Sequence, residues 1–322
     1  MRSPGLACTH KFRSMHIILG AGGPISNSLT GYLLKQDQKL RLVSRRKLTR
    51  FESAEWVGAD LKNGTEVLQA VRGATVIYMC AGLKYDKKIW AVEWPLIAQN
   101  LINAANEAGA RLIFFDNVYA YGKVNGPMTE ATPYQPSSVK GEIRAKIARQ
   151  IMDEDQKGHI KASICRAADF YGSETLNSFF DSMVLANFAK GKKAMWLGNP
   201  EARHSLTYVP DAGRALYLLG NDPASSGQVW HAPTAPALIG KAYIELAAKI
   251  FGVPPKFTTV NKFMLQLIGL FNKPIGEAAE LYYQNASDYI FDSSKFEKHF
   301  GVSPTTYEAG VSAFRNNKFL NR

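Results

Sequence analysis

The chain has 322 residues, 46% of them hydrophobic and 20% charged, a composition typical of a globular protein rather than a disordered one. No segment approaches the roughly 20 consecutive apolar residues of a membrane-spanning helix, so we expect no membrane contact. The formal net charge of +12 comes from scattered Lys and Arg residues, without the basic runs or zinc-finger spacing typical of nucleic-acid binding, and we expect no nucleic-acid partner.

The N-terminal segment, residues 1–14, lacks the apolar core of a signal peptide, and we interpret it as a disordered tail with Met15 opening the fold. It includes Cys8, whereas Cys80 and Cys165 lie in apolar runs typical of buried strands. Three cysteines are too few for a disulfide framework, which favours a reducing compartment, and we expect a cytoplasmic protein. The six histidines show no metal-ligand spacing, so the sequence predicts no metal site.

Short β-rich runs alternate with helical patterns in the first half of the chain, beginning with a predicted strand at 16–19. This alternation predicts a parallel sheet with helices on both faces, that is, an α/β fold with a Rossmann-type doubly wound sheet. Apolar residues recur at helical spacing along 25–33, 96–105 and 138–152, and each pattern predicts a helix. Further strands are predicted at 40–43, 75–80, 111–115 and 162–165.

The regular alternation fades after about residue 169, where Pro and Gly separate shorter elements. We therefore predict a dinucleotide-binding domain over 15–168 and a smaller C-terminal substrate-binding region over 169–322. Residues from about 205 to 232 are expected to return to the sheet. The C-terminal region should cover the carboxyl ends of the strands, where sheets of this kind bind ligands.

A glycine-rich segment, Gly20 to Ser26, joins the first predicted strand to the first predicted helix. Glycine permits a tight turn there and lets the backbone approach a pyrophosphate, whose charge the helix N-terminus stabilises. Pro24 suits the first helical turn. The third glycine of the usual fingerprint is absent, and Ser26 is small enough to replace it. Although such turns also occur for structural reasons, the context predicts a dinucleotide site contacted by Gly20, Gly23, Pro24 and Ile25.

The end of the second predicted strand indicates which dinucleotide is bound. An NAD-selective site usually places an acidic residue there to bind the ribose 2′-hydroxyl. This chain has Ser44, Arg45 and Arg46 instead. Arginine can pair with a 2′-phosphate through two hydrogen bonds, and Ser44 can donate another. The alternative is a solvated basic turn. The sequence thus favours NADP as the cofactor, with NAD as the second choice.

Several ordered segments add to this picture: Ala59-Asp60-Leu61, Cys80-Ala81-Gly82, Phe115 to Gly122, Arg166 to Gly172 and Leu206 to Asp211. Together they resemble the extended short-chain dehydrogenase/reductase superfamily, close to the NAD-dependent epimerase/dehydratase group, over most of residues 15–320. The resemblance implies that Asp60 and Leu61 contact the adenine and that Cys80, Ala81 and Gly82 pass under the cofactor. It also implies homodimerisation through a helix pair that would include residues 138–155.

The catalytic positions of that superfamily carry different residues here. Its proton-transfer tyrosine falls on Lys140, its ribose-binding lysine on Arg144 and its serine on Asn117. Positions four apart share a helix face, so Lys140 and Arg144 should point together towards the site. Arg144 could hold a ribose hydroxyl and Asn117 a substrate carbonyl.

Lys140 belongs to both the catalytic and the cofactor-binding candidates, and two roles for it stay open. Beside a permanent cation it could act as an acid or base, or it could bind an anionic ligand without proton transfer. Tyr119 is the second candidate acid. Tyr121 is expected to pack structurally, and Tyr134 has a weaker claim because it lies in a loop ahead of the helix.

Other residues have both a functional and a simpler structural interpretation. His204 could face the substrate, with a surface position as the default. A predicted amphipathic helix over 276–283 carries Glu280 and Tyr283, which could line a substrate pocket. The simpler interpretation is that the glutamates are solvated and the tyrosine packs against the protein. The tryptophans are expected in the core or the pocket wall: Trp90, Trp94 and Trp196.

The sequence as a whole predicts an NAD(P)-dependent oxidoreductase or epimerase-like enzyme with an altered proton-transfer site. Its substrate would be a small carbonyl or hydroxyl compound or a nucleotide sugar, and the surplus of positive charge suits an anionic one. The alternative is a catalytically silent NADP-sensing regulatory protein, because the fold alone does not secure the chemistry.

Overall fold

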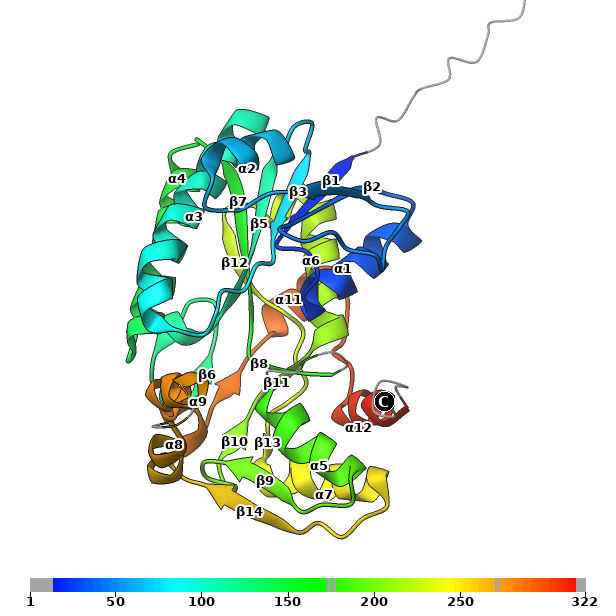
Figure 1. Ribbon diagram of the computed structural model, residues 1–322, viewed down its shortest axis with the longest axis vertical. Coiled ribbons are helices and arrows are strands. Elements are labelled where there is room, and N and C mark those ends of the chain that lie inside the picture. Colours follow the sequence, from blue (N-terminus) through cyan, green and yellow to red (C-terminus); the bar gives the residue numbers. More distant parts are fainter. Residues whose placement is uncertain (1–13, 173–174, 176–177, 270, 272, 317–322) are drawn as a thin grey trace, which may run out of the picture.

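The computed structural model describes residues 14–172, 175, 178–269, 271 and 273–316. Within them, a seven-stranded parallel sheet forms the centre of the larger part of the molecule, with helices on both faces (Figure 1). This confirms the predicted α/β fold with a Rossmann-type doubly wound sheet. From one edge to the other, the strands are β12 (Gln228–His231), β7 (Lys161–Ala167), β5 (Arg111–Asn117), β4 (Val76–Met79), β1 (Met15–Leu19), β2 (Lys39–Ser44) and β3 (Glu55–Gly58).

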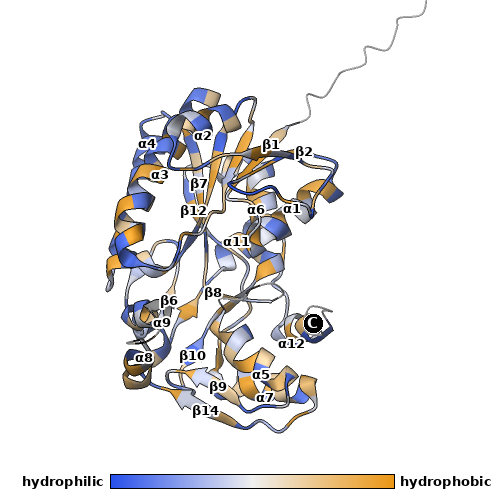
Figure 2. Ribbon diagram, in the orientation of Figure 1, coloured by the Kyte–Doolittle hydropathy of each residue, from blue (hydrophilic) through white to orange (hydrophobic). Residues whose placement is uncertain are grey.

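Two apolar cores separate along the strands, because successive side chains of a strand point to opposite faces. Ile17 and Leu19 of β1 pack towards one helical layer, and Ile18 packs towards the other. Figure 2 shows the strands as mainly hydrophobic and the covering helices as mixed. The first layer holds α2 (Gly64–Ala70), α3 (Lys87–Ala108) and α4 (Val139–Gln156), and the second holds α1 (Pro24–Lys35) and α6 (Val209–Asn221).

The predicted strands correspond to β1, β2, β4, β5 and β7, and the predicted helices lie within α1, α3 and α4. Strand β3 was not predicted, because its four residues are only partly buried and show no alternation of apolar and polar residues. It pairs with β2 at the edge of the sheet and brings Trp56 beside the end of that strand.

The rest of the chain forms a smaller group of short paired strands and helices at the carboxyl ends of the sheet strands (Figure 1). Its core is aromatic and includes Tyr171, Phe180, Trp196, Tyr243 and Tyr307. The paired strands are β8 (Asp169–Tyr171) with β11 (Leu206–Tyr208), β9 (Ala194–Leu197) with β14 (Phe257–Val260), β10 (Arg203–His204) with β13 (Leu238–Ile239), and β6 (Pro127–Met128) with β15 (Ile290–Phe291). The helical elements of this group are the π-helix η2 (Phe180–Leu185), α5 (Ala186–Ala189), α7 (Gly240–Phe251), α8 (Lys262–Gly269), α9 (Lys273–Ala278), α10 (Tyr283–Ala286), α12 (Tyr307–Asn316) and the 3-10 turns η1 (Tyr119–Tyr121) and η4 (Ala279–Leu281). Helix α11 (Ser294–Phe300) packs instead on the second core of the sheet, and the 3-10 turn η3 (Pro223–Ser225) lies between α6 and β12.

Two sequence expectations are settled by this arrangement. Trp90, Trp94 and Trp196 are all buried, which confirms that they belong to the core. The amphipathic helix predicted over 276–283 is instead divided among α9, η4 and α10. Among the described helices, none is long and apolar enough to cross a membrane.

A buried carboxyl group in η2 predicts a pH-dependent change in stability. Asp181 is buried, accepts hydrogen bonds from the Gly172 amide at 3.0 and 3.2 Å, and contacts the Thr175 hydroxyl. Burial raises the pKa of Asp181 to about 8, so the folded protein binds this proton more tightly than the unfolded chain does. The folded state therefore loses stability as the pH rises from about 4 to about 8.

We expect Asp181→Asn to remove this titration. The free energy of unfolding of the variant minus that of the wild type should increase by roughly 3–5 kcal/mol between pH 4 and pH 8 and then level off. Urea unfolding at a series of pH values measures this difference. A difference that stays constant across the window would show that Asp181 is ionised in the folded protein.

Candidate functional site

The glycine-rich turn follows β1, the strand at which the order of the sheet reverses, and ligands bind at such switch points. Gly20 has a φ of +78°, and a Cβ there would lie 2.3 Å from the Cα of Ala81. The amides of Gly20 and Ala21 both donate to the Val43 carbonyl at 3.0 Å. Glycine is therefore required at position 20 because β1 and the segment after β4 approach each other closely.

Ser26 holds this turn by its hydroxyl group as well as by its small size. The Ser26 hydroxyl accepts from the Gly22 amide at 2.9 Å and donates to the Gly23 carbonyl at 2.8 Å. Helix α1 begins at Pro24, with Gly23 as its N-cap and no acidic side chain in its first turn. The helix N-terminus therefore offers backbone amides and no competing carboxylate to an anion.

The space beside two glycines shows whether the turn has room for a dinucleotide. A Cβ on Gly23 would have no neighbour closer than 4.0 Å, and one on Gly82 would have none within 4 Å. Side chains at these positions would fill space beside the turn, so the space that glycine leaves fits a bound dinucleotide.

At the end of β2, Ser44 is half-buried and the two arginines that follow it are exposed. The Ser44 hydroxyl donates to the Arg46 carbonyl at 2.7 Å and accepts from Trp56 Nε1 at 3.0 Å. A bond from Ser44 to a ribose phosphate would have to replace the bond to Arg46. The side chains of Arg45 and Arg46 are exposed at the carboxyl end of the strand.

The other cofactor candidates lie along the same edge of the sheet. The Asp60 carboxylate accepts from the Lys62 amide at 3.0 Å, and Leu61 packs against the apolar core. Cys80 extends β4, with its amide donating to the Leu19 carbonyl at 2.9 Å. Burial raises the pKa of the Cys80 thiol to about 12, so the thiol stays protonated and is a poor nucleophile.

The end of β5 carries Asn117 and Tyr119. The Asn117 side-chain oxygen accepts from the Tyr119 amide at 3.0 Å. The Tyr119 ring stacks on Trp90, and its hydroxyl lies 3.5 Å from that of Tyr85. Burial raises the pKa of Tyr119, so its phenol keeps its proton at neutral pH. Tyr85, which the sequence did not single out, comes from the loop before α3.

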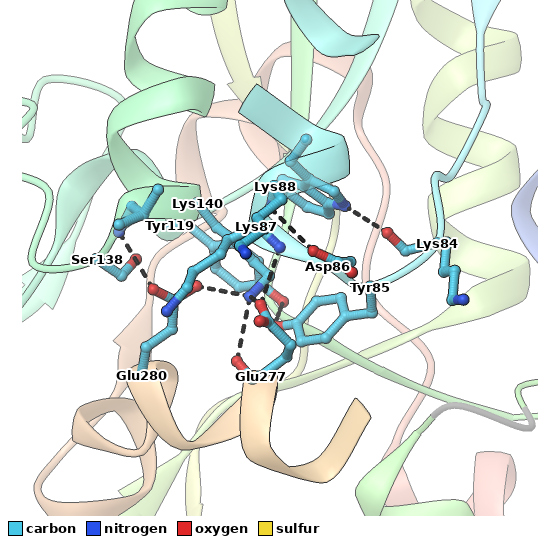
Figure 3. Close-up of polar contacts among 12 residues, drawn as sticks. Lys84, Tyr85, Asp86, Lys87, Lys88, Tyr119, Ser138, Lys140, Glu277 and Glu280 are labelled. Carbon is cyan, nitrogen blue, oxygen red and sulfur yellow. Dashed lines mark hydrogen bonds and ion pairs between the residues drawn. The ribbon is translucent and has the colours of Figure 1, made fainter. Parts of the chain in front are cut away.

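Lys140 lies at the start of α4 and is completely buried. Its ammonium group donates to Glu277 Oε2 at 2.7 Å, to the Glu277 carbonyl at 3.1 Å and to Glu280 Oε1 at 2.6 Å (Figure 3). It also lies 4.5 Å from the centroid of the Tyr85 ring. An ammonium group has three protons, so all the donors of Lys140 are used by the chain itself.

Arg144 faces a different partner from Lys140, although both residues are on the same helix. Arg144 Nε donates to Asp116 Oδ1 at 2.6 Å, and Arg144 Nη2 donates to the Phe115 carbonyl at 3.2 Å. Asp116 Oδ2 also contacts Nε of the buried Arg166 at 3.1 Å. The expectation that Lys140 and Arg144 point together into one site is therefore wrong, because the two side chains bind different carboxylates. Sequence reasoning missed Asp116. The pattern that could have indicated it is a single charged residue at the end of an apolar strand.

Two further residues take positions different from the default expectations. His204 is buried rather than on the surface, with Nε2 2.9 Å from Asp169 Oδ2 and its ring stacked on Tyr289. Glu280 is not a solvated glutamate, because it is paired with Lys140. In the part of the chain that the structure describes, no group of three His, Cys, Asp or Glu side chains is arranged to hold a metal ion.

Comparisons with known proteins agree with the fold. Solved structures with similar folds include the UDP-N-acetylglucosamine 4-epimerase from Bacillus cereus, with 14% identity, a TM-score of 0.76 and coverage of 94% of this chain and 95% of that chain. The dTDP-glucose 4,6-dehydratase from Bacillus anthracis str. Ames in complex with NAD has 15% identity, a TM-score of 0.76 and the same coverage. The UDP-glucose 4-epimerase of Thermus thermophilus in complex with NAD has 15% identity, a TM-score of 0.76 and coverage of 94% and 98%.

No curated protein matches the chain. Residues 16–231, which include the glycine-rich turn, Asn117 and Lys140, match the family described as the NAD dependent epimerase/dehydratase family. This chain therefore belongs to the NAD-dependent epimerase/dehydratase family.

Proposed function

We propose that the chain binds NADP at the carboxyl edge of its sheet and catalyses oxidoreduction or epimerisation of a small carbonyl or hydroxyl compound, with a nucleotide sugar as the preferred class. The observation that carries this proposal is the turn from Gly20 to Gly23, which places the N-terminus of α1 at the switch point of the sheet. Family membership and the nucleotide-sugar enzymes among the similar folds support the substrate class.

The preference for NADP rests on the two exposed arginines after β2. Arg45 and Arg46 stand where an NAD-selective site would carry an acidic residue, and two guanidinium groups suit a phosphate better than a hydroxyl. The similar structures named above are NAD complexes where a cofactor is named, so the preference for NADP rests on the arginines of this chain alone.

Replacing both arginines tests the cofactor preference. In the Arg45→Ala/Arg46→Ala double variant we expect the affinity for NADPH to fall by roughly 10- to 100-fold, because a charge-assisted pair is lost. The affinity for NADH should change by less than about threefold. Titration calorimetry measures both. Arg72→Ala is the matched control, since Arg72 is also exposed but precedes β4, at the amino ends of the sheet strands. Equal losses for NADPH and NADH would contradict the proposed recognition of the 2′-phosphate.

We assign proton transfer to Tyr119 rather than to Lys140. Tyr119 carries a phenolic hydroxyl and is only partly buried, whereas the three donors of Lys140 are occupied by the chain itself. The Asn117 side-chain amide can donate to a substrate oxygen, because its own oxygen is already held by the Tyr119 backbone. When bound, the nicotinamide group supplies the hydride chemistry.

A silent NADP sensor is the second candidate, and one observation favours it. Lys140 and Arg144, at the positions of the usual catalytic residues, both bind carboxylates of the chain itself. Incubation with 4-deuterated NADPH and a panel of aldehydes, ketones and keto nucleotide sugars, each of which offers a carbonyl carbon to the hydride, separates the two candidates. Deuterium transfer to one of these compounds supports the enzyme. Tight NADPH binding without transfer to any compound supports the sensor.

A further inference from the structure

Residues 276–286, here called the strap, lie against the N-terminal ends of α3 and α4. The strap comprises the end of α9, η4 and α10, and it lies against Tyr85 and Tyr119 (Figure 3). Its C-terminal end is fixed by the backbone, because the Asn285 carbonyl accepts from the Asn199 amide at 2.8 Å. Its N-terminal end has a different kind of attachment, made by the carboxylates of Glu277 and Glu280.

Each of these carboxylates joins Lys140 to the N-terminus of a helix. Glu277 Oε2 contacts Lys140 Nζ at 2.7 Å and accepts from the Lys87 amide, the first residue of α3, at 2.9 Å. Glu280 contacts Lys140 Nζ through Oε1 at 2.6 Å and accepts from the Val139 amide, the first residue of α4, through Oε2 at 3.3 Å. A carboxylate near a helix N-terminus is stabilised by the helix dipole, so three sources of positive potential meet at this point.

The direction of the pKa shift of Glu277 agrees with an ion pair between Glu277 and Lys140. Partial burial alone would raise the pKa of Glu277, but hydrogen bonds from Lys140 and from the Lys87 backbone amide outweigh burial and lower it. The carboxylate is therefore ionised at neutral pH, and the contact with Lys140 is an ion pair.

Apolar packing adds little at this end of the strap. Although Leu281 is buried, none of the four apolar clusters found among the described residues includes a residue of the strap. At this end of the strap, the ion pairs at Lys140 are therefore the polar contacts that join it to α4, beside its packing against α8.

We propose that Lys140 is a latch that holds the strap closed over the substrate side of the site and thereby positions Tyr119 and Tyr85 for the reaction. In this role Lys140 is a positioning residue and transfers no proton. It explains why an ammonium group replaces the family's tyrosine at this position: a phenol has one proton to donate, whereas the latch uses three. The positioning part of this inference rests on the function proposed above, and the latch itself does not.

Hydrogen exchange of the free protein, followed by mass spectrometry, tests the latch without any ligand. In Lys140→Met we expect amides of the strap to exchange at least tenfold faster than in the wild type, while amides of β4 and β5 change by less than about threefold. Lys140→Arg keeps a cation and should keep strap exchange within about threefold of the wild type. Asp288→Asn is the matched control, because it breaks an exposed ion pair with Arg203 just beyond the strap.

Lys140→Met leaves two partly buried carboxylates without a cation and could unfold the chain, so a charge-free variant completes the test. Lys140→Met/Glu277→Gln/Glu280→Gln should fold and still show fast exchange confined to the strap. Strap protection equal to the wild type in this variant would overturn the proposal, as would a loss of protection spread equally over β4 and β5. NADPH titration of the wild type is a separate measurement: absence of binding would refute the proposed function and leave the latch standing.

Discussion

Gly20→Ala should destabilise the protein by roughly 3 kcal/mol or more and weaken NADPH binding at least 100-fold. An alanine at position 20 would keep a φ of +78°, which is costly for an L-residue, and would place its Cβ 2.3 Å from the Cα and 2.5 Å from the nitrogen of Ala81. Both contacts are with backbone, so β1 and the segment after β4 would have to move apart. Urea unfolding and titration calorimetry measure the two effects.

Gly31→Ala is the control for this substitution. Gly31 lies inside α1, and a Cβ there would have no neighbour within 4 Å. Because alanine favours the helix over glycine, we expect a gain of about 0.5–1 kcal/mol and unchanged NADPH affinity. If Gly20→Ala were as stable as the wild type, the close approach of residues 20 and 81 would be refuted.

Asp116→Asn is expected to cost roughly 3–5 kcal/mol of the free energy of unfolding. The side chain of Asp116 is buried between the guanidinium groups of Arg144 and Arg166, with Oδ1 2.6 Å from Arg144 Nε and Oδ2 3.1 Å from Arg166 Nε. Asparagine keeps the shape and removes the charge, which leaves two buried cations without their shared carboxylate. Chemical unfolding measures the loss.

The exposed pair of Arg203 and Asp288 provides the comparison for Asp116. Both of its side chains are about half exposed, at 54% and 43%, so water screens the interaction. Asp288→Asn should therefore change the free energy of unfolding by less than about 1 kcal/mol. Equal effects of the two substitutions would show that Asp116 is not the counter-ion of a buried cluster.

Most of the sheet could be predicted from the sequence because its inner strands are short apolar runs, such as 111–115, whose burial alone determines their structure. The turn at Gly20 could be predicted because its glycines lie between a strand and a helix. The additional role of Ser26 could not, since a hydroxyl bonded to both Gly22 and Gly23 depends on the turn being formed. The edge strand β3 is too short and too exposed to show a pattern.

The partners of the charged site residues could not be predicted, because they come from distant parts of the chain. Lys140 is held by carboxylates 137 and 140 residues away in the sequence. The position of Arg144 beside Asp116 depends on how α4 packs on β5. Helical spacing predicts which residues share a face, and it does not predict which charges meet that face after folding.

A crystal structure of the protein with bound NADPH would test the central claim most directly. We expect the pyrophosphate to lie against the backbone amides of Gly23 and Ile25 at the start of α1, the 2′-phosphate to contact Arg45 or Arg46, and Lys140 Nζ to remain bound to Glu277 and Glu280. A dinucleotide bound elsewhere would contradict the proposed cofactor site. Lys140 bonded to the nicotinamide ribose instead of to Glu277 and Glu280 would contradict the latch.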